Sequence, residues 1–378
     1  SLRASFDPYA VPVALQRIWQ ADSVEGLEAP VGKSAWFKSV SLTHLDSVEA
    51  EKAVVNELRA QRAEPFDLAK PLLPRLTVAS LPPGKHTVLL TLHHAIVDGF
   101  SVQILLSDLS RFYAAAVSGK KLVEIESPSY CCFADFERQL VLRDRSARRF
   151  WSNTVQGWQS GPHAMVNMPA LKINLRDEDV VRVARTLDAN YLHGLQSAAR
   201  KANVTLAAFL HAAWGATYAK LTCSEDILYG NTSSGRSANI PEIGGIVGPV
   251  INTFPMRYTV EAGQSVGDYL HSVQRTLVNS LEFESFPLAE IQKLAPGGGK
   301  LFSVIFDFQT SAWDHVLTAD SGDKKGVSMT QSRLLDRIGC PISIRVIVDK
   351  DVLQLHATSE CKEYGHAVLE SMLSSLVH

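Results

Sequence analysis

The chain has 378 residues, of which 46% are hydrophobic and 20% charged, a composition typical of folded globular domains rather than disordered or fibrous ones. Its length predicts two lobes of ~100–200 residues each instead of a single core. The formal charge of -2 supplies no basic field, so neither nucleic acid nor an anionic membrane is predicted as a partner.

Cysteine content and hydropathy predict a cytoplasmic protein. The five cysteines are an odd number without CxxC spacing, which favours reduced thiols over a disulfide framework. The N-terminus lacks the basic and apolar regions of a signal peptide. The most apolar helical stretch, 204–221, contains His211 and Lys220 and therefore predicts a buried core helix rather than a membrane span.

The first strong element in chain order is HTVLLTLHH (86–94), a continuous apolar run that predicts a strand buried on both faces. After Gly99, apolar residues recur at helical spacing. We expect Ser101 to cap this helix and Gly119 to close it. The two histidines are thus expected at a strand end, and Asp98 in the turn that leads into the helix.

Later elements alternate between helix and strand. Residues 130–155 predict a second long helical region, and 157–172, which opens with glycines and prolines without periodicity, predicts a linker. This linker would separate an N-terminal lobe, 1–156, from a C-terminal lobe, 173–378. The second lobe is predicted to contain a strand at 180–187, a helix at 188–202, a helix capped by Thr205, a strand at 226–230, a hairpin turning at 349–351 and a C-terminal helix. The mixture indicates the α/β or α+β class.

The stretch TLHHAIVDGF (91–100) gathers polar residues at the predicted strand end. A lone histidine there is usually structural, but a cluster of buried polar groups requires a partner for each. A metal site is not predicted, because His93 and His94 are neighbours in a strand and point to opposite faces. A Ser-His-Asp triad needs a presented nucleophile, and the stretch 91–100 contains no serine. We therefore favour His94 as general base or hydrogen-bond partner in a channel, with Asp98 shaping the loop and Gly99 permitting a tight turn.

The segment HHAIVDG resembles the HHxxxDG motif of the condensation domains of nonribosomal peptide synthetases. Those domains have the chloramphenicol-acetyltransferase-like fold, in which two similar lobes form a V around a tunnel. Two further matches depart from the family pattern. Lys70 replaces a glycine in FDLAKPLLPRL (66–76), and phenylalanine replaces both tyrosines in FADFERQL (133–140). The further matching segments, in family order, are FDLAKPLLPRL (66–76), FADFERQL (133–140), GNTSSGR (230–236), GGIVGPVINTFPMR (244–257), FESFPLAEI (283–291) and LFSVIFDFQT (301–310).

The resemblance assigns roles to these residues. It implies that His94 faces the tunnel where an acceptor amine attacks a donor thioester, with His93 and Gly99 as support. It also implies that Asp98 is structural and pairs with Arg236. The domain would bind no cofactor of its own. Its substrates would arrive on the phosphopantetheine arms of an upstream donor carrier and a downstream acceptor carrier, beside an adenylation domain, and the excised domain would be monomeric.

The opening SLRASF (1–6) resembles the family's HExLRxxF segment without its histidine. We therefore expect that the family's opening strand and helix are missing and that the first lobe lacks a strand. Several alternatives stay open within and outside the family. These are a terminal cyclising or ester-forming domain, an epimerisation domain, a coenzyme A-dependent acyltransferase and a degenerate domain that only docks carriers. An aspartate-rich heterocyclisation motif is absent from 93–99, and DFQT (307–310) is a poor match to the acyltransferases' DFGWG.

Overall fold

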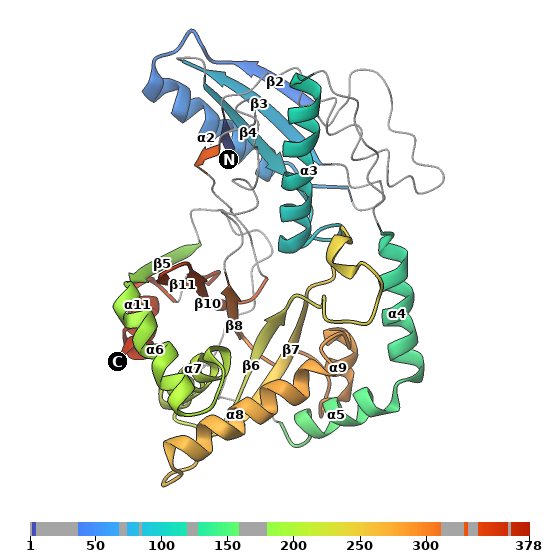
Figure 1. The fold of residues 1–378 in the computed structure, drawn as a ribbon, viewed down its shortest axis with the longest axis vertical. Helices are drawn as coiled ribbons and strands as arrows, with labels where there is room; N and C mark the ends of the chain where they lie inside the picture. The colour runs from blue at the N-terminus through green and yellow to red at the C-terminus, as the bar shows by residue number, and fades with distance from the viewer. Residues whose placement is uncertain are drawn as a thin grey trace. The chain divides into compact units, whose positions relative to one another are not determined.

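A computed structural model describes residues 2–4, 37–67, 74–82, 85–118, 128–158, 180–310, 329–331, 339–361 and 364–378 (Figure 1). Its contacts divide the chain into two compact units that alternate along the sequence. Unit 1 comprises Ser1–Phe133, Asn239–Val250 and Ala312–Asp336, and unit 2 comprises Ala134–Ala238, Ile251–Ser311 and Arg337–His378. The predicted linker, 157–172, lies almost wholly outside the described residues, so the predicted lobe boundary stays a prediction.

Unit 1 is built on a five-stranded mixed sheet in the order β2-β3-β4-β1-β9. The strands are β1 (Leu2–Ala4), β2 (Phe37–Ser41), β3 (Arg75–Leu81), β4 (Lys85–Thr91) and β9 (Met329–Gln331). Strand β2 runs parallel to β3, and the other pairs are antiparallel. Strand β4 lies inside the sheet, and Thr87, Val88 and Leu89 are buried in succession, which confirms the predicted buried strand. It ends at Thr91, three residues earlier than predicted, so both histidines lie in the following loop.

Two helices of unit 1 follow strands of this sheet in the chain, one after β2 and one after β4. Helix α2 (Ser47–Ala63) begins after Asp46, whose carboxylate caps it, and its Ala50 and Val54 pack against Leu81 and Leu89 of β3 and β4. Helix α3 (Gly99–Val117) follows the loop after β4. The predicted closing residue, Gly119, lies outside the described residues. The loop between β4 and α3 is therefore joined at both ends to regular structure.

Unit 2 contains a six-stranded mixed sheet in the order β5-β11-β10-β8-β6-β7. Its strands are β5 (Val181–Leu187), β6 (Asp226–Ser233), β7 (Asn252–Thr259), β8 (Val304–Thr310), β10 (Ile342–Asp349) and β11 (Val352–Ser359). Strand β8 pairs in parallel with both β10 and β6. Asp349 pairs with Val352 around a two-residue turn, which confirms the predicted hairpin. The predicted strand at 226–230 extends to Ser233.

The helices of unit 2 pack around that sheet (Figure 1). They are α5 (Arg145–Val155), α6 (Ala189–Lys201), α7 (Leu206–Thr222), α8 (Val266–Leu281), α9 (Leu288–Leu294) and α11 (His366–Val377), and α4 (Tyr130–Arg143) begins in unit 1 and continues into unit 2. Thr205 caps α7 as predicted, its Oγ1 accepting from the Ala208 amide at 3.1 Å. The helical region predicted over 130–155 is confirmed, and it consists of two helices, α4 and α5. Asp144 ends α4 and caps α5 because its carboxylate accepts the Ser146 and Ala147 amides at 2.9 Å.

Helix α7 is the most buried helix of unit 2 and confirms the predicted core helix. Trp214 is fully buried against Phe306, with stacked rings 5.8 Å apart. His211 is also buried, and its Nδ1 lies 3.0 Å from the Tyr229 hydroxyl. Within the described residues, no helix combines the length and apolar character that crossing a membrane requires.

Burial of His211 makes the stability of unit 2 depend on pH. Burial lowers the pKa of His211 to about 3, from an ordinary value of 6.5. The unfolded chain therefore binds an extra proton between these values, so the stability from the neutral ring is present above pH 6.5 and is lost as the pH falls toward 3. We expect this ring to contribute a slope of up to ~1.4 kcal/mol per pH unit to the free energy of unfolding. Urea unfolding of wild type and His211→Gln from pH 7 to 4.5 checks this, and parallel curves would contradict it.

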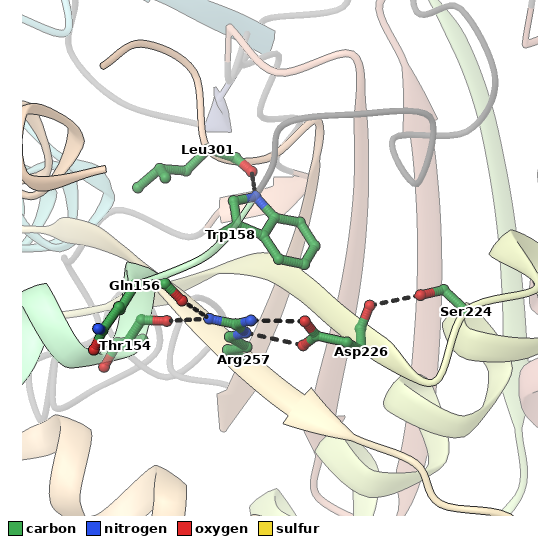
Figure 2. Close-up of polar contacts among 7 residues, drawn as sticks. All are labelled: Thr154, Gln156, Trp158, Ser224, Asp226, Arg257 and Leu301. Atoms are coloured by element: carbon green, nitrogen blue, oxygen red, sulfur yellow. Dashed lines mark hydrogen bonds and ion pairs between the residues drawn. The ribbon is translucent and has the colours of Figure 1, made fainter. Parts of the chain in front are cut away.

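The end of α5 is held by an arginine from β7, as Figure 2 shows. Arg257 forms a bidentate pair with Asp226, at 2.9 Å from Nε and 2.7 Å from Nη2. Its Nη1 donates to the carbonyls of Thr154 and Gln156 at 3.1 and 2.7 Å, so it satisfies the C-terminal carbonyls of α5. The pair with Asp226 raises the pKa of Arg257. This arginine, the last residue of GGIVGPVINTFPMR, is thus a structural residue of unit 2.

Replacing Arg257 with alanine is expected to lower the free energy of unfolding by ~2–3 kcal/mol. The substitution removes the partner of Asp226 and of two helix carbonyls, although the partly exposed carboxylate limits the loss. Lys293→Ala, which removes the partner of Glu290 in an exposed pair on α9, is the matched control and should cost less than ~0.5 kcal/mol. Equal urea midpoints for the two variants would contradict the assignment.

Candidate functional site

Of the five residues predicted for the site, His93, His94 and Asp98 lie in the loop 92–98, and Gly99 follows it directly. His94 is exposed, whereas Asp98 is buried, with 2% of its surface accessible. His93 is half-buried. The two imidazoles therefore have different environments, although both lie in the loop and not in the strand.

His93 stabilises the loop from within. Its Nδ1 accepts a hydrogen bond from the Ala95 amide at 3.1 Å, and its carbonyl accepts from the Ile96 amide at 3.1 Å. Nδ1 is thus an acceptor, and the neutral ring carries its proton on Nε2. The ring also meets Phe66 edge to face, with centroids 5.5 Å apart. These contacts fix the turn from which His94 projects.

Two residues of the segment FDLAKPLLPRL (66–76) support His93. The Arg75 guanidinium lies over the Phe66 ring, 4.0 Å from its centroid, on the ring that His93 contacts. Arg75 also donates to the carbonyl of Gln61, in the last turn of α2, and to those of Glu64 and Pro65, just after the helix, at 2.6–3.0 Å. Sequence comparison matched this segment without giving it a role. In the structure, Phe66 contacts His93, and Arg75 contacts Phe66. Residues 68–73, between them, lie outside the described part of the chain.

Asp98 caps α3. Its Oδ1 accepts from the Ser101 amide at 2.6 Å and from the Ser101 hydroxyl at 2.7 Å, and its carbonyl accepts from the Val102 amide. The prediction that Ser101 is the cap is therefore wrong, because the side chain that lies just outside the helix is Asp98. Gly99 takes the first helical position instead of a tight turn. A second bond, from the Val250 amide to Asp98 Oδ2 at 3.0 Å, joins this cap to residues 239–250 of unit 1.

Arg236 lies in unit 2, in the loop that follows β6. Its predicted pairing with Asp98 of unit 1 stays a prediction. The loop itself is held by Glu284, a buried carboxylate that accepts hydrogen bonds from the hydroxyls of Ser233 and Ser237. Asn252 donates to the Glu284 carbonyl at 2.7 Å. Three segments that were matched separately in the sequence, 230–236, 244–257 and 283–291, thus meet around Glu284.

Sequence reasoning missed the roles of Ser101 and Glu284. Ser101 carried a signal, a hydroxyl near a helix start. Its contact with Gly248, 147 residues later, leaves no signal in the sequence. Glu284 is likewise 47 and 51 residues from its serine partners. Among the residues that the structure describes, no group of three His, Cys, Asp or Glu side chains could hold a metal ion. The candidate site is built from His94 on a loop that the hydrogen bonds of His93 and Asp98 hold.

Comparison with known sequences identifies relatives of this chain. The family model described as "Condensation domain" matches residues 32–377. A linear gramicidin synthase of Brevibacillus parabrevis is 26% identical over 337 residues, 88% of this chain and 6% of that protein. Bacitracin synthase 1 of Bacillus licheniformis is 22% identical over 383 residues, 100% of this chain and 7% of that protein. The chain thus spans less than a tenth of the length of these two synthases.

Solved structures share the fold. The X-domain from teicoplanin biosynthesis matches with a TM-score of 0.81 at 18% identity, covering 100% of this chain and 87% of that one. The first condensation domain of the calcium-dependent antibiotic synthetase matches with a TM-score of 0.71 at 17% identity, covering 100% and 88%. An epimerization domain of a tyrocidine synthetase matches with a TM-score of 0.74 at 16% identity, covering 100% and 90%. The shared fold therefore does not select among the reactions named for these domains.

Proposed function

The chain belongs to the condensation-domain family, and on that premise we propose that it forms an amide bond between two carrier-bound substrates. The donor is an acyl, aminoacyl or peptidyl thioester, and the acceptor is an amine. The main support is His94, an exposed imidazole on a loop that β4 holds at one end and the Asp98 cap at the other. An exposed ring on a fixed backbone is suited to meeting a reacting group in a defined orientation.

In the proposed reaction the acceptor nitrogen attacks the thioester carbonyl and a C–N bond forms. The C–S bond then breaks, and the proton lost by nitrogen ends on the leaving thiol. His94 would bind the amine through a ring nitrogen and either accept this proton or orient the tetrahedral intermediate. The amine has a pKa of ~8, so a useful fraction is neutral near pH 7. Holding both reactants together can supply ~7–11 kcal/mol, whereas general-base help adds ~10²–10⁴ in rate, so positioning is the larger effect.

The partners follow from the same proposal. Upstream and downstream carrier domains would present their substrates on phosphopantetheine arms, and an adenylation domain would lie adjacent in the same synthetase. The great length of the related synthases supports this multidomain setting. The domain would need no cofactor of its own and would act in the cytoplasm. Within it, we propose that Asp98 also pairs with Arg236.

One experiment tests this function directly. The protein is mixed with a donor-loaded and an acceptor-loaded carrier, and intact mass spectrometry follows the acceptor carrier. An acceptor-bound amide thioester is expected, and coenzyme A thioesters alone should give no product. A changed stereocentre without amide formation would indicate epimerisation, an ester or ring would indicate a terminal cyclising domain, and carrier binding without any product would indicate a docking domain. Each of these three results would overturn the proposal.

A further inference from the structure

Ser101 lies at the centre of a buried cluster in unit 1. Its hydroxyl oxygen is 2.7 Å from Asp98 Oδ1 and 2.9 Å from both the amide nitrogen and the carbonyl oxygen of Gly248. The single hydroxyl proton can serve the carboxylate or the carbonyl, while the oxygen accepts the Gly248 amide. Asp98 Oδ2 accepts the Val250 amide at 3.0 Å. We call Asp98, Ser101, Gly248 and Val250 the Ser101 cluster.

The Ser101 cluster is closed to water. The residues Ser101, Asp98 and Val250 are 0%, 2% and 1% exposed. Hydrogen bonds in such a site are strong, and a donor left without its acceptor there is costly. The cluster therefore fixes the first turn of α3 to residues 248–250 in one arrangement.

The ring of Tyr130 packs against the backbone of Gly248. A Cβ built on Gly248 would lie 2.2 Å from Cδ2 of Tyr130 and 2.8 Å from Cε2 and Cγ of that ring, which no real side chain tolerates. Three residues earlier, a Cβ on Gly245 would lie 3.2 Å from Pro128. Gly245 and Gly248 thus lie directly against Pro128, which precedes α4, and Tyr130, which is its first residue. Only glycine at position 248 permits both this contact and the hydrogen bonds to Ser101.

We infer that Ser101 and Gly248 are positioning residues for His94. Asp98 is the last residue of the His94 loop, so any shift of the Ser101 cluster moves the loop end four residues after the imidazole. The other loop end is fixed in the sheet by β4. With both ends held, the loop has little freedom to move the ring, and a displacement of about 1 Å can cost ~10²-fold in rate. This inference rests on the proposed function of His94, while the cluster itself is a feature of unit 1.

The test compares two serine-to-alanine variants that each remove one buried hydroxyl. Ser101→Ala breaks the cluster. Ser280→Ala is the matched control, because Ser280 is 2% exposed in α8 of unit 2 and donates to the Thr276 carbonyl at 2.8 Å. Condensation between loaded carriers gives kcat and KM, and hydrogen exchange measures protection of the Gly248 and Val250 amides. An NMR spectrum of the histidine rings reports the environment of His94.

For Ser101→Ala we expect kcat to fall at least about tenfold with KM within about twofold, because the carriers still bind while the ring is misplaced. The Gly248 and Val250 amides should exchange at least about tenfold faster, and the His94 ring resonance should shift. Ser280→Ala should change none of these. An unchanged exchange rate would overturn the cluster. Faster exchange with wild-type kcat, or with an unshifted His94 resonance, would overturn the positioning role.

A second pair of variants tests the same role from the opposite side. Gly248→Ala should lower kcat in the same way, because the added methyl meets the Tyr130 ring. Adding Tyr130→Ala removes that ring, so the double variant should recover activity relative to Gly248→Ala alone, and an absence of recovery would contradict the steric argument. If the wild-type protein makes no amide, the proposed function fails. The exchange and NMR measurements then still decide whether the cluster holds the loop.

Discussion

Replacing His94 with alanine is expected to lower the rate of amide formation by ~10²–10⁴ while leaving the thermal midpoint within about 1 °C of wild type. The ring is exposed and takes no part in the hydrogen bonds that hold the loop, so its removal should not unfold unit 1. Product formation by intact mass and a thermal melt on the same sample check both parts. A folded variant with the wild-type rate would remove His94 from the mechanism.

Two companions sharpen this result. His193→Ala removes an exposed histidine from α6 of unit 2 and should leave the rate unchanged. His94→Gln keeps a side chain that donates and accepts hydrogen bonds but cannot take a proton at neutral pH. If orientation is the larger part of the role, the glutamine variant should retain much more activity than alanine. Equal loss in both would assign His94 mainly to proton transfer.

Replacing Asp98 with alanine should damage both stability and activity. Three buried donors, the amide and hydroxyl of Ser101 and the amide of Val250, would lose their hydrogen bond to the carboxylate. The Ser101 hydroxyl and the Val250 amide keep the Gly248 carbonyl as an acceptor at 2.9 Å. Losing three hydrogen bonds to a buried charged group is expected to cost ~3–5 kcal/mol in the free energy of unfolding. Urea unfolding measures the loss, and the condensation assay should show a fall in rate, because α3 and the His94 loop lose their common fixed point.

The control for Asp98 is another helix cap. Asp188 caps α6 and is exposed, and its carboxylate accepts the Tyr191 amide at 2.9 Å, so Asp188→Ala should cost ~1 kcal/mol. Equal losses at both positions would show that Asp98 acts as an ordinary cap. A double-mutant cycle with Arg236→Ala tests the proposed ion pair. Additive losses from the Asp98 and Arg236 variants would contradict it.

Short-range chemistry made much of this site predictable. The apolar run before His93 predicted a buried strand, and the helical spacing after Gly99 predicted α3, because both signals lie within one element. The position of the cap was not predictable in the same way. Asp98 and Ser101 both carry an oxygen suited to a helix start, and only the backbone conformation decides which of them lies outside the first turn.

Long-range contacts account for what the sequence left out. The acceptor of the Gly248 amide is 147 residues away in the chain, and the serines on Glu284 are separated from it by about fifty residues. The Tyr130 ring that requires glycine at position 248 also leaves no periodic pattern. Such partners depend on the path of the chain through unit 1 and unit 2, which periodicity within single elements does not specify.

Strand β9 and residues 239–250 have a consequence for synthesis on the ribosome. Both belong to unit 1, and β9 pairs with β1 through Arg3 and Gln331 although more than three hundred residues separate them. The sheet of unit 1 therefore cannot gain its fifth strand until Gln331 has left the ribosome tunnel, by which time much of unit 2 has been translated. For the same reason, a chimera made by joining two relatives at one crossover near residue 157 would mix parental segments within unit 1. Exchanging all three of its segments together avoids that mixture.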